Sequence, residues 1–314
     1  MAWEYAGLFD AIVNDSQDDL LADYWKSQPT AIRVGSMGYR TRTTKAGTRL
    51  EAEIHPLFGR EKEGRLREAR KNMTPERQRK QNIQRAKRRL ILLLEENFTV
   101  WEDIHITLTY AGRDLPGEKQ VKRDLRNFLG KVKRLREKRN MPELKYLYAI
   151  GDDAENRPHI HLIMNGGLGR EELEKIWGHG FANSTSLQEY GNGLQGMANY
   201  LFKQKEKARN RERRQTFRSW SGSRNLRKPK EHVSDCKISN RRVKIIAQDF
   251  RSQAKEIMEK IYPGYTLENC GVYYSDVVDG VYIRCVMRRK DRGGACLHSD
   301  SGSGRSGGTI RRGS

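Results

Sequence analysis

The chain lacks the features of membrane proteins and of disulfide-bonded domains. No apolar run reaches the roughly 18 residues that a membrane-spanning helix needs, and the longest one, LILLL from Leu90, ends at Glu95. The start, MAWEYAGLFD, has no basic stretch followed by an apolar one, so we expect no export signal and a cytoplasmic location. The cysteines are too far apart for a C-x-x-C metal clip, and we expect free thiols at Cys236, Cys270, Cys285 and Cys296.

Acidic residues are in the minority. There are 61 Lys and Arg against 40 Asp and Glu, which gives a net charge of +21, a pI near 9.9 and a mean hydropathy of -0.88. Such a charge predicts a polyanionic partner, either nucleic acid or an anionic membrane surface. The chain also has no G-x-x-x-x-G-K-[ST] segment, so it cannot hydrolyse ATP through a P-loop.

With 314 residues the chain is long enough for more than one domain, and we divide it into five segments. The stretch AIRVGSMGYRTRTTKAGTRLEAEIHP predicts a hairpin around Gly47, and a basic helical pair broken near Thr74 and Pro75 follows it. The basic helices have two open interpretations, a solvated surface or direct DNA contact. The expected segments are 1–100 with this hairpin and helical flank, a domain at 101–206, a basic linker at 207–231, a small α+β unit at 232–290 and a Gly/Ser/Arg-rich disordered tail at 291–314.

The central domain shows frequent changes of hydrophobic period. Period-two alternation predicts strands, and helical spacing predicts helices such as the one with Val121, Leu125, Phe128 and Val132 on one face. The expected order is strand 103–110, helix 118–139, strands 144–151 and 159–165, helix 170–178, strand 181–188 and helix 193–207. This β-α-β-β-α-β order predicts an α+β fold with a split-βαβ, ferredoxin-like antiparallel sheet. In the C-terminal unit we expect a helix at 240–262 and strands at 269–277 and 280–289.

Two histidines lie side by side in the strand PHIHLIM. His159 and His161 project from one face of the strand, and Ile160 and Leu162 project from the other. Two imidazoles on one face can bind a single divalent ion, although one H-x-H motif is weak evidence by itself. A carboxylate ligand would favour Mg²⁺ or Mn²⁺ and would come from Asp152 or Asp153; either one is otherwise an ordinary turn residue.

Tyr200 and Lys203 lie on one face of the last predicted helix of the domain, in NYLFKQ. A phenol beside a cation and in front of a metal-polarised phosphate can attack phosphorus and form a 5′-phosphotyrosine with a free 3′-OH. The alternative is an aromatic side chain that only packs an amphipathic helix.

These pieces resemble the motifs of the HUH endonuclease superfamily, and more closely those of rolling-circle replication initiators of plasmids and filamentous-type phages. HITLTY corresponds to the first-strand motif, HIH to the metal motif, and Tyr200-Leu201-Phe202-Lys203 to the Tyr-x-x-Lys motif. The resemblance covers roughly residues 30–290 and implies that His159 and His161 bind metal, that Tyr200 is the nucleophile and that Lys203 steadies the phosphate or phenolate. Many relatives have a glutamate where this chain has GDD, so an aspartate must reach the ion through a shorter side chain, and we favour Asp152.

The resemblance implies a metal-dependent nickase of single-stranded or hairpin origin DNA, which would depend on a host helicase and DNA polymerase. Only one tyrosine lies on the helix face, which favours a single-tyrosine cycle. We expect no membrane partner and leave the oligomeric state open. Trp177 and Trp220 are candidate stacking residues. The residues expected to bind nucleic acid are Lys122, Arg123, Arg126, Lys133, Arg157, Arg218, Trp220, Arg224 and Lys228.

Three alternatives compete with this interpretation. A transposase or mobilisation relaxase shares the chemistry, but relaxases place the tyrosine before the histidines, and the small transposases lack such long flanks. A non-catalytic ferredoxin-like module that binds RNA or DNA fits the charge but has no use for the histidines. A barrel-type metalloenzyme would need about 250 residues of alternating strand and helix.

Overall fold

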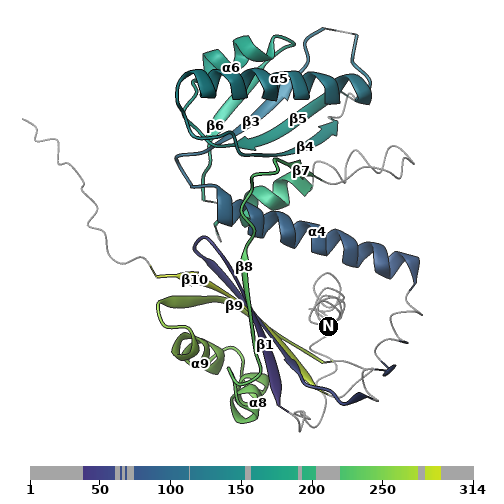
Figure 1. Ribbon diagram of the computed structural model, residues 1–314. Helices are drawn as coiled ribbons and strands as arrows, with labels where there is room; N and C mark the ends of the chain where they lie inside the picture. Colours follow the sequence, from purple (N-terminus) through teal and green to yellow (C-terminus); the bar gives the residue numbers. More distant parts are fainter. Residues whose placement is uncertain are drawn as a thin grey trace, which may run out of the picture.

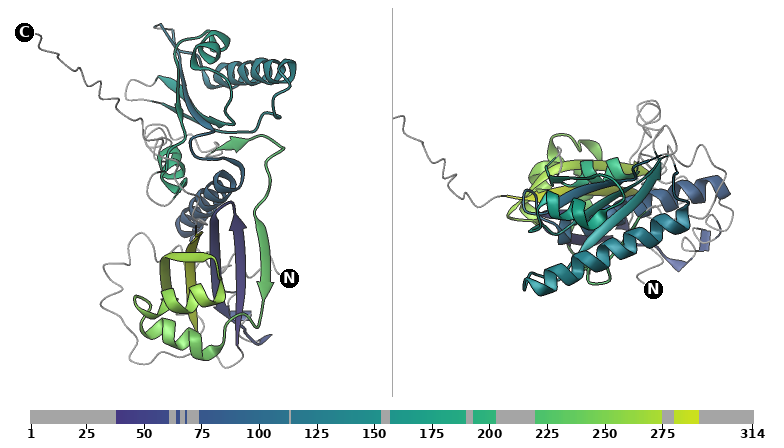
Figure 2. Two further views of the ribbon diagram at one scale, coloured as in Figure 1. Left: turned by 90° about the vertical axis from the view of Figure 1, so that its left-hand side faces the viewer. Right: turned by 90° about the horizontal axis from the view of Figure 1, so that it is seen from above.

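The computed structural model describes residues 38–60, 64–65, 68, 74–112, 114–152, 157–189, 193–202, 220–274 and 280–290. Two five-stranded antiparallel sheets dominate it, each with a pair of helices on one face (Figure 1). Helix α4 (Pro75–Asn97) runs between the two sheets, as the side view in Figure 2 also shows. We refer to the two halves as the upper and lower lobes, after their places in Figure 1.

The upper lobe has the strand order β6-β3-β5-β4-β7. The chain order β-α-β-β-α-β and this arrangement confirm the expected α+β, ferredoxin-like sheet. The short β7, from the segment expected as a linker, extends the sheet beside β4. The elements are β3 (Ile104–Thr109), α5 (Glu118–Lys138), β4 (Tyr146–Asp152), β5 (Pro158–Met164), α6 (Arg170–Trp177), β6 (Ala182–Ser186) and β7 (Ser221–Gly222).

One face of the upper sheet is covered by α5 and α6. The apolar residues of α5 recur at helical spacing, and they pack on the side chains that alternate residues of the strands turn toward them, such as Ile106 and Leu162. Trp177 ends α6 inside this core with 2% of its surface exposed, and its indole nitrogen donates to the Thr109 carbonyl. Trp177 is therefore a core residue and not a surface for base stacking.

The opposite face of the upper sheet is only partly covered. The apolar half of α4, from Leu90 to Leu94, packs there on Leu147 and Ile163. A helix over residues 195–202 packs beside α4 with Ala198 and Leu201 in the same core. His159 and His161 lie on this same sheet face, because they alternate with Ile160 and Leu162, which belong to the core under α5.

The lower lobe joins segments from both ends of the chain. Its sheet has the order β8-β1-β2-β10-β9, and β10 pairs directly with β2, with Ile283 opposite Ile54. The hairpin and the C-terminal unit, which we expected in separate segments, thus form one sheet with one core. The elements are β1 (Tyr39–Ala46), β2 (Arg49–Pro56), β8 (Lys230–Ser234), α8 (Asn240–Gln248), α9 (Gln253–Ile261), β9 (Tyr265–Tyr274) and β10 (Val281–Arg289).

The single helix expected at 240–262 is two helices, α8 and α9, which pack on the lower sheet. The break follows Gln248, where the Asp249 carboxylate accepts a hydrogen bond of 3.2 Å from the backbone nitrogen of Ser252. Local side-chain bonding of this kind competes with helix continuation. The break lets both helices bury their apolar faces against the same sheet.

Helix α4 touches the tip of the β1–β2 hairpin. Gly47 has a φ of +55°, and a side chain there would collide with the carbonyl of Glu95. Its backbone nitrogen donates to the Glu96 carboxylate at 3.0 Å. A glycine is thus needed both for the two-residue turn and for the close approach of the two lobes.

Cys236, Cys270 and Cys285 are free thiols, and the last two lie opposite each other on β9 and β10. Across the described residues, no helix is long and apolar enough to cross a membrane.

Candidate active site

Strands β3 and β5 bring polar side chains together on the partly covered face of the upper sheet. In the antiparallel register, Thr107 lies opposite His161 and Thr109 lies opposite His159. Opposite residues project to the same side, so both histidines lie beside threonine side chains of β3. The two rings are 4.8 Å apart between centroids, with 9% of His159 and 2% of His161 exposed. The H-x-H pair is therefore formed as the alternation predicted.

A third histidine, which the motif analysis did not single out, completes the cluster. His105 lies on β3, and its Nε2 atom is 3.3 Å from Nδ1 of His161. The two rings are stacked, with centroids 5.4 Å apart. The sequence does contain a signal for it: HIT in β3 alternates with period two, so His105 and Thr107 share a face. The signal has meaning only once β3 is known to pair with β5.

Tyr200 reaches this cluster from the 195–202 helix. Its ring lies edge-on to His161 at 5.1 Å and to His105 at 6.0 Å between centroids. The neighbouring Ala198 and Leu201 are buried and hold the helix against the sheet, whereas Tyr200 is 40% exposed. The phenol is therefore both next to the histidines and open to a large substrate.

Burial keeps these histidines neutral. Loss of hydration lowers the pKa of His105 to about 4. Burial, together with the proximity of His159 and His105, lowers the pKa of His161 to about 3. A neutral imidazole is the form that binds metal ions.

The donor atoms of the cluster suit a metal ion. Nδ1 of His161 also lies 3.3 Å from the Thr107 hydroxyl, while its Nε2 atom is buried and has no hydrogen-bond partner. When Nδ1 donates its proton to Thr107 or His105, Nε2 keeps a free lone pair. A buried nitrogen with an unused lone pair fits an ion ligand better than a structural role.

The carboxylates predicted as third ligands are not placed by their side chains. Asp152 ends β4 opposite Pro158 in the strand register, and its side chain lies outside the described part of the chain, as does all of Asp153. Lys203 and Arg218 also lie outside it. Among the described residues no group of three His, Cys, Asp or Glu side chains is arranged to hold a metal ion.

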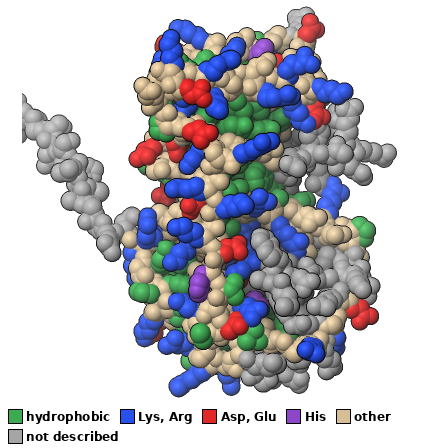
Figure 3. All heavy atoms as spheres, viewed as in Figure 1, with side chains coloured by type: hydrophobic (Ala, Val, Ile, Leu, Met, Phe, Trp, Pro, Cys, Tyr) green, Lys and Arg blue, Asp and Glu red, His purple; other side chains and the backbone are tan. Residues whose placement is uncertain are grey.

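The cations predicted to bind nucleic acid fall into two groups. Those of α5 are exposed, but α5 covers the sheet face opposite to the histidines; they are Lys122, Arg123, Arg126 and Lys133. Arg157 directly precedes β5, and its backbone carbonyl lies 3.4 Å from Nδ1 of His159. Arg224 and Lys228 are exposed in the segment between β7 and β8. Figure 3 shows Lys and Arg side chains over both lobes and across the region between them.

Trp220, predicted as a stacking residue, is only partly exposed and packs against the core between α4 and the upper sheet. Its indole nitrogen donates to the carbonyl of Ala86 at 3.0 Å. This contact fits a packing role.

One family comparison bears on the site. Residues 103–208 match the model of a family described as Replication-associated protein ORF2. The matched segment includes β3 to β6, the three histidines and Tyr200. No curated protein and no solved structure matches the chain. The family match covers about one third of the 314 residues and supports a protein of the replication-initiator type.

Proposed function

We propose that the chain is a rolling-circle replication initiator that nicks one strand of its origin DNA through Tyr200. The observation that carries the proposal is the position of the exposed Tyr200 ring, 5.1 Å from the ring of His161 in a cluster of three histidines. The net charge of +21 fits a nucleic-acid substrate, and the family match supports an initiator role.

In the proposed reaction, the Tyr200 hydroxyl oxygen attacks the scissile phosphorus, and the bond from phosphorus to the 3′ oxygen breaks. The phenol loses its proton and the 3′ oxygen gains one, so the products are a 5′-phosphotyrosine and a free 3′-OH. His159 and His161 would hold a divalent ion, Mg²⁺ or Mn²⁺, with Asp152 or Asp153 as a further ligand. A bound ion of this kind supplies Lewis-acid polarisation of the phosphate.

The other residues of the chain bind and orient the DNA. The partly covered sheet face leaves Tyr200 open to a single strand, and Arg157 beside β5 is placed to contact a phosphate near the cut. Lys203, three residues after the nucleophile, would steady the charge that develops on the phosphate. Without a P-loop the protein would rely on a host helicase for unwinding and on a host polymerase to extend the 3′ end.

The test is an adduct assay. A labelled single-stranded oligonucleotide with the origin sequence is incubated with the protein and Mn²⁺, and a denaturing gel detects the covalent protein–DNA product. We expect the adduct with wild type, none after addition of EDTA, and none with Tyr200→Phe. The matched control Tyr265→Phe changes a tyrosine of the lower lobe and should leave the adduct intact.

His161→Ala should slow adduct formation while oligonucleotide binding stays near normal. An adduct with Tyr200→Phe would show that the nucleophile is another residue. A wild-type protein that binds single strands or RNA but never cleaves would favour the non-catalytic binding module instead.

A further inference from the structure

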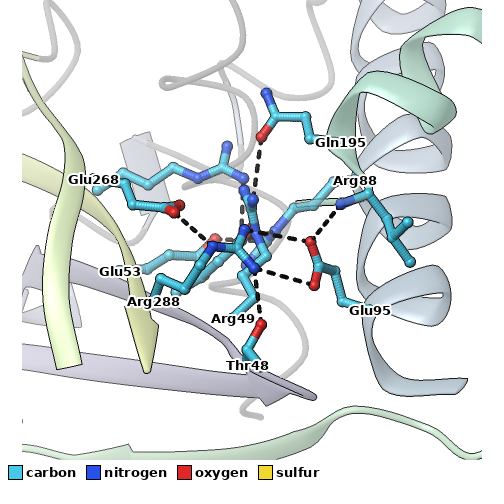
Figure 4. Close-up of polar contacts among 11 residues, drawn as sticks. Thr48, Arg49, Glu53, Arg88, Glu95, Gln195, Glu268 and Arg288 are labelled. Carbon is cyan, nitrogen blue, oxygen red and sulfur yellow. Dashed lines mark hydrogen bonds and ion pairs between the residues drawn. The ribbon is translucent and has the colours of Figure 1, made fainter. Parts of the chain in front are cut away.

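The helix that carries Tyr200 is attached at its beginning to residues outside the upper sheet. The backbone nitrogen of Leu194 donates to Oε1 of Glu95 in α4, at 3.0 Å, in a buried contact. The next side chain, Gln195, accepts a hydrogen bond of 3.1 Å from Arg49 of β2 in the lower lobe. Two charged side chains thus hold the first turn of the helix, and one of them belongs to the other lobe (Figure 4).

Glu95 is itself held by the lower lobe. Arg288 of β10 points both terminal nitrogens at its carboxylate at 3.4 Å, and it also donates to the hydroxyl of Thr48 at 2.8 Å. Its Nε atom donates to Glu268 of β9 at 2.5 Å. Burial opposes the charge of Arg288, but these two carboxylates outweigh burial and raise its pKa above the usual value. Arg288 therefore remains a cation and orients Glu95 toward Leu194.

Arg49 is also fixed in direction. Its Nε atom donates to Oε1 of Glu51 at 2.9 Å, and both side chains are buried. Arg88 of α4 and Arg284 of β10 bind the other oxygen of the same carboxylate, at 2.7 and 3.1 Å. An arginine tied in this way loses little further freedom when it contacts Gln195.

The close fit extends to the residue before the helix. Gly193 has a φ of +66°, and an added Cβ would collide with the Glu95 carboxylate and the Arg288 guanidinium. The backbone therefore approaches the charged groups as closely as it can. Only glycine combines this φ with this contact at low cost.

We propose that Glu95, Arg288 and Arg49 are positioning residues that aim the Tyr200 helix at the histidine cluster, so that the lower lobe is part of the nicking machinery. Tyr200 lies five residues, or about 7.5 Å along the helix axis, beyond Gln195. A helix this short moves as a rigid rod, so a tilt at its first turn displaces the phenol. This inference rests on the proposed function, because it assigns the contacts a purpose in nicking.

A purely structural role would not require charged groups. Apolar packing of the same volume stabilises a fold as well as a buried ion pair does, without the loss of hydration. Hydrogen bonds to one backbone nitrogen and one amide oxygen, by contrast, define a direction and a register for the helix. The network thus provides orientation where simple packing would provide only contact.

The test uses the full-length protein with Glu95→Gln, Gln195→Ala and Gln195→Glu. Arg289→Gln is the control, since Arg289 is an exposed cation at the end of the same strand as Arg288. We expect Glu95→Gln and Gln195→Ala to lower the single-turnover nicking rate by about ten- to a hundredfold. Affinity for the oligonucleotide, measured in a Tyr200→Phe background, should change by less than about twofold. Gln195→Glu should restore the rate, since its carboxylate still accepts from Arg49.

A second measurement does not depend on activity. Hydrogen exchange of the amides in 194–202 should become about tenfold faster in Glu95→Gln and Gln195→Ala, while exchange in β3 and β5 stays as in wild type. Unchanged exchange in 194–202, or a rate loss that disappears well below the thermal midpoint of the variant, would overturn the positioning role. A wild-type protein that never nicks would refute the proposed function, and the exchange measurement would still decide whether these residues anchor the helix.

Discussion

His105 Nε2 lies 3.3 Å from His161 Nδ1, across two adjacent antiparallel strands. His105 can therefore accept the Nδ1 proton of His161 and leave Nε2 of His161 free for an ion. Its ring also contacts Tyr200, so it touches both the metal motif and the candidate nucleophile. The first-strand motif thus contributes a functional side chain as well as a strand.

We predict that His105→Ala lowers the nicking rate by roughly ten- to a hundredfold, as the loss of a residue behind a metal ligand usually does. Titration with Mn²⁺ should also show that a higher concentration is needed for half-maximal rate. The control His232→Gln removes an exposed imidazole on β8 and should have no effect. An unchanged Mn²⁺ dependence in His105→Ala would rule out this role.

The cations of α5 should act on long DNA only. Because α5 covers the sheet face opposite to Tyr200, Arg123→Gln with Arg126→Gln should leave cleavage of a short oligonucleotide within about twofold of wild type. Binding of a long origin duplex should lose about one unit of salt dependence for each removed phosphate contact, measured by titration at several salt concentrations. Arg157→Gln, beside β5, should instead slow cleavage of the short oligonucleotide. Equal effects of the two changes on that substrate would contradict this division.

Glu51 should be essential for the stability of the lower lobe. Burial alone would raise its pKa, but the guanidinium groups of Arg88, Arg284 and Arg49 hold the pKa well below its usual range. Glu51→Gln leaves three arginines around an uncharged side chain, and we expect a loss of about 3–5 kcal/mol in the free energy of unfolding. Urea denaturation measures it, with the exposed Glu76→Gln of α4 as control. A loss below about 1 kcal/mol would show that the arginines find other counter-charges.

His55 should make stability depend on pH. Burial lowers its pKa to about 4, from 6.5 in an exposed histidine. The unfolded chain then binds a proton that the folded chain does not, so this stability is complete above pH 6.5 and is lost as the pH falls toward 4. At its largest the contribution is roughly 3 kcal/mol. The free energy of unfolding, measured from about pH 7 to about pH 5, should fall less steeply in His55→Gln, by about one proton. Parallel curves for the two proteins would show that His55 is hydrated in the folded state.

Most elements of the upper sheet could be predicted because their signals are local. The alternation in PHIHLIM places His159 and His161 on one face of any strand, and the spacing of Val121, Leu125 and Phe128 selects one face of a helix. Both periods follow from the backbone geometry of the element itself. The same local reasoning placed Tyr200 on a helix, but it gave no distance between the phenol and the histidines.

The break between α8 and α9 was missed for a related reason. The apolar spacing continues across residues 240–262, so periodicity alone favours one helix. The bond from Ser252 to Asp249 that accompanies the break competes with this pattern only weakly in the sequence. Packing of both helices on one sheet decides in favour of two.

The sequence by itself determined the β-α-β-β-α-β order, the basic surface and the chemical types of the candidate site, because each depends on composition or on neighbours within a few residues. Only the tertiary structure decided that the hairpin joins the C-terminal strands, that His105 belongs to the cluster and that α5 lies behind the sheet. Those relations connect residues far apart in the chain, as in the pairing of β2 with β10. Such pairing depends on which surfaces bury one another, and no local period encodes it.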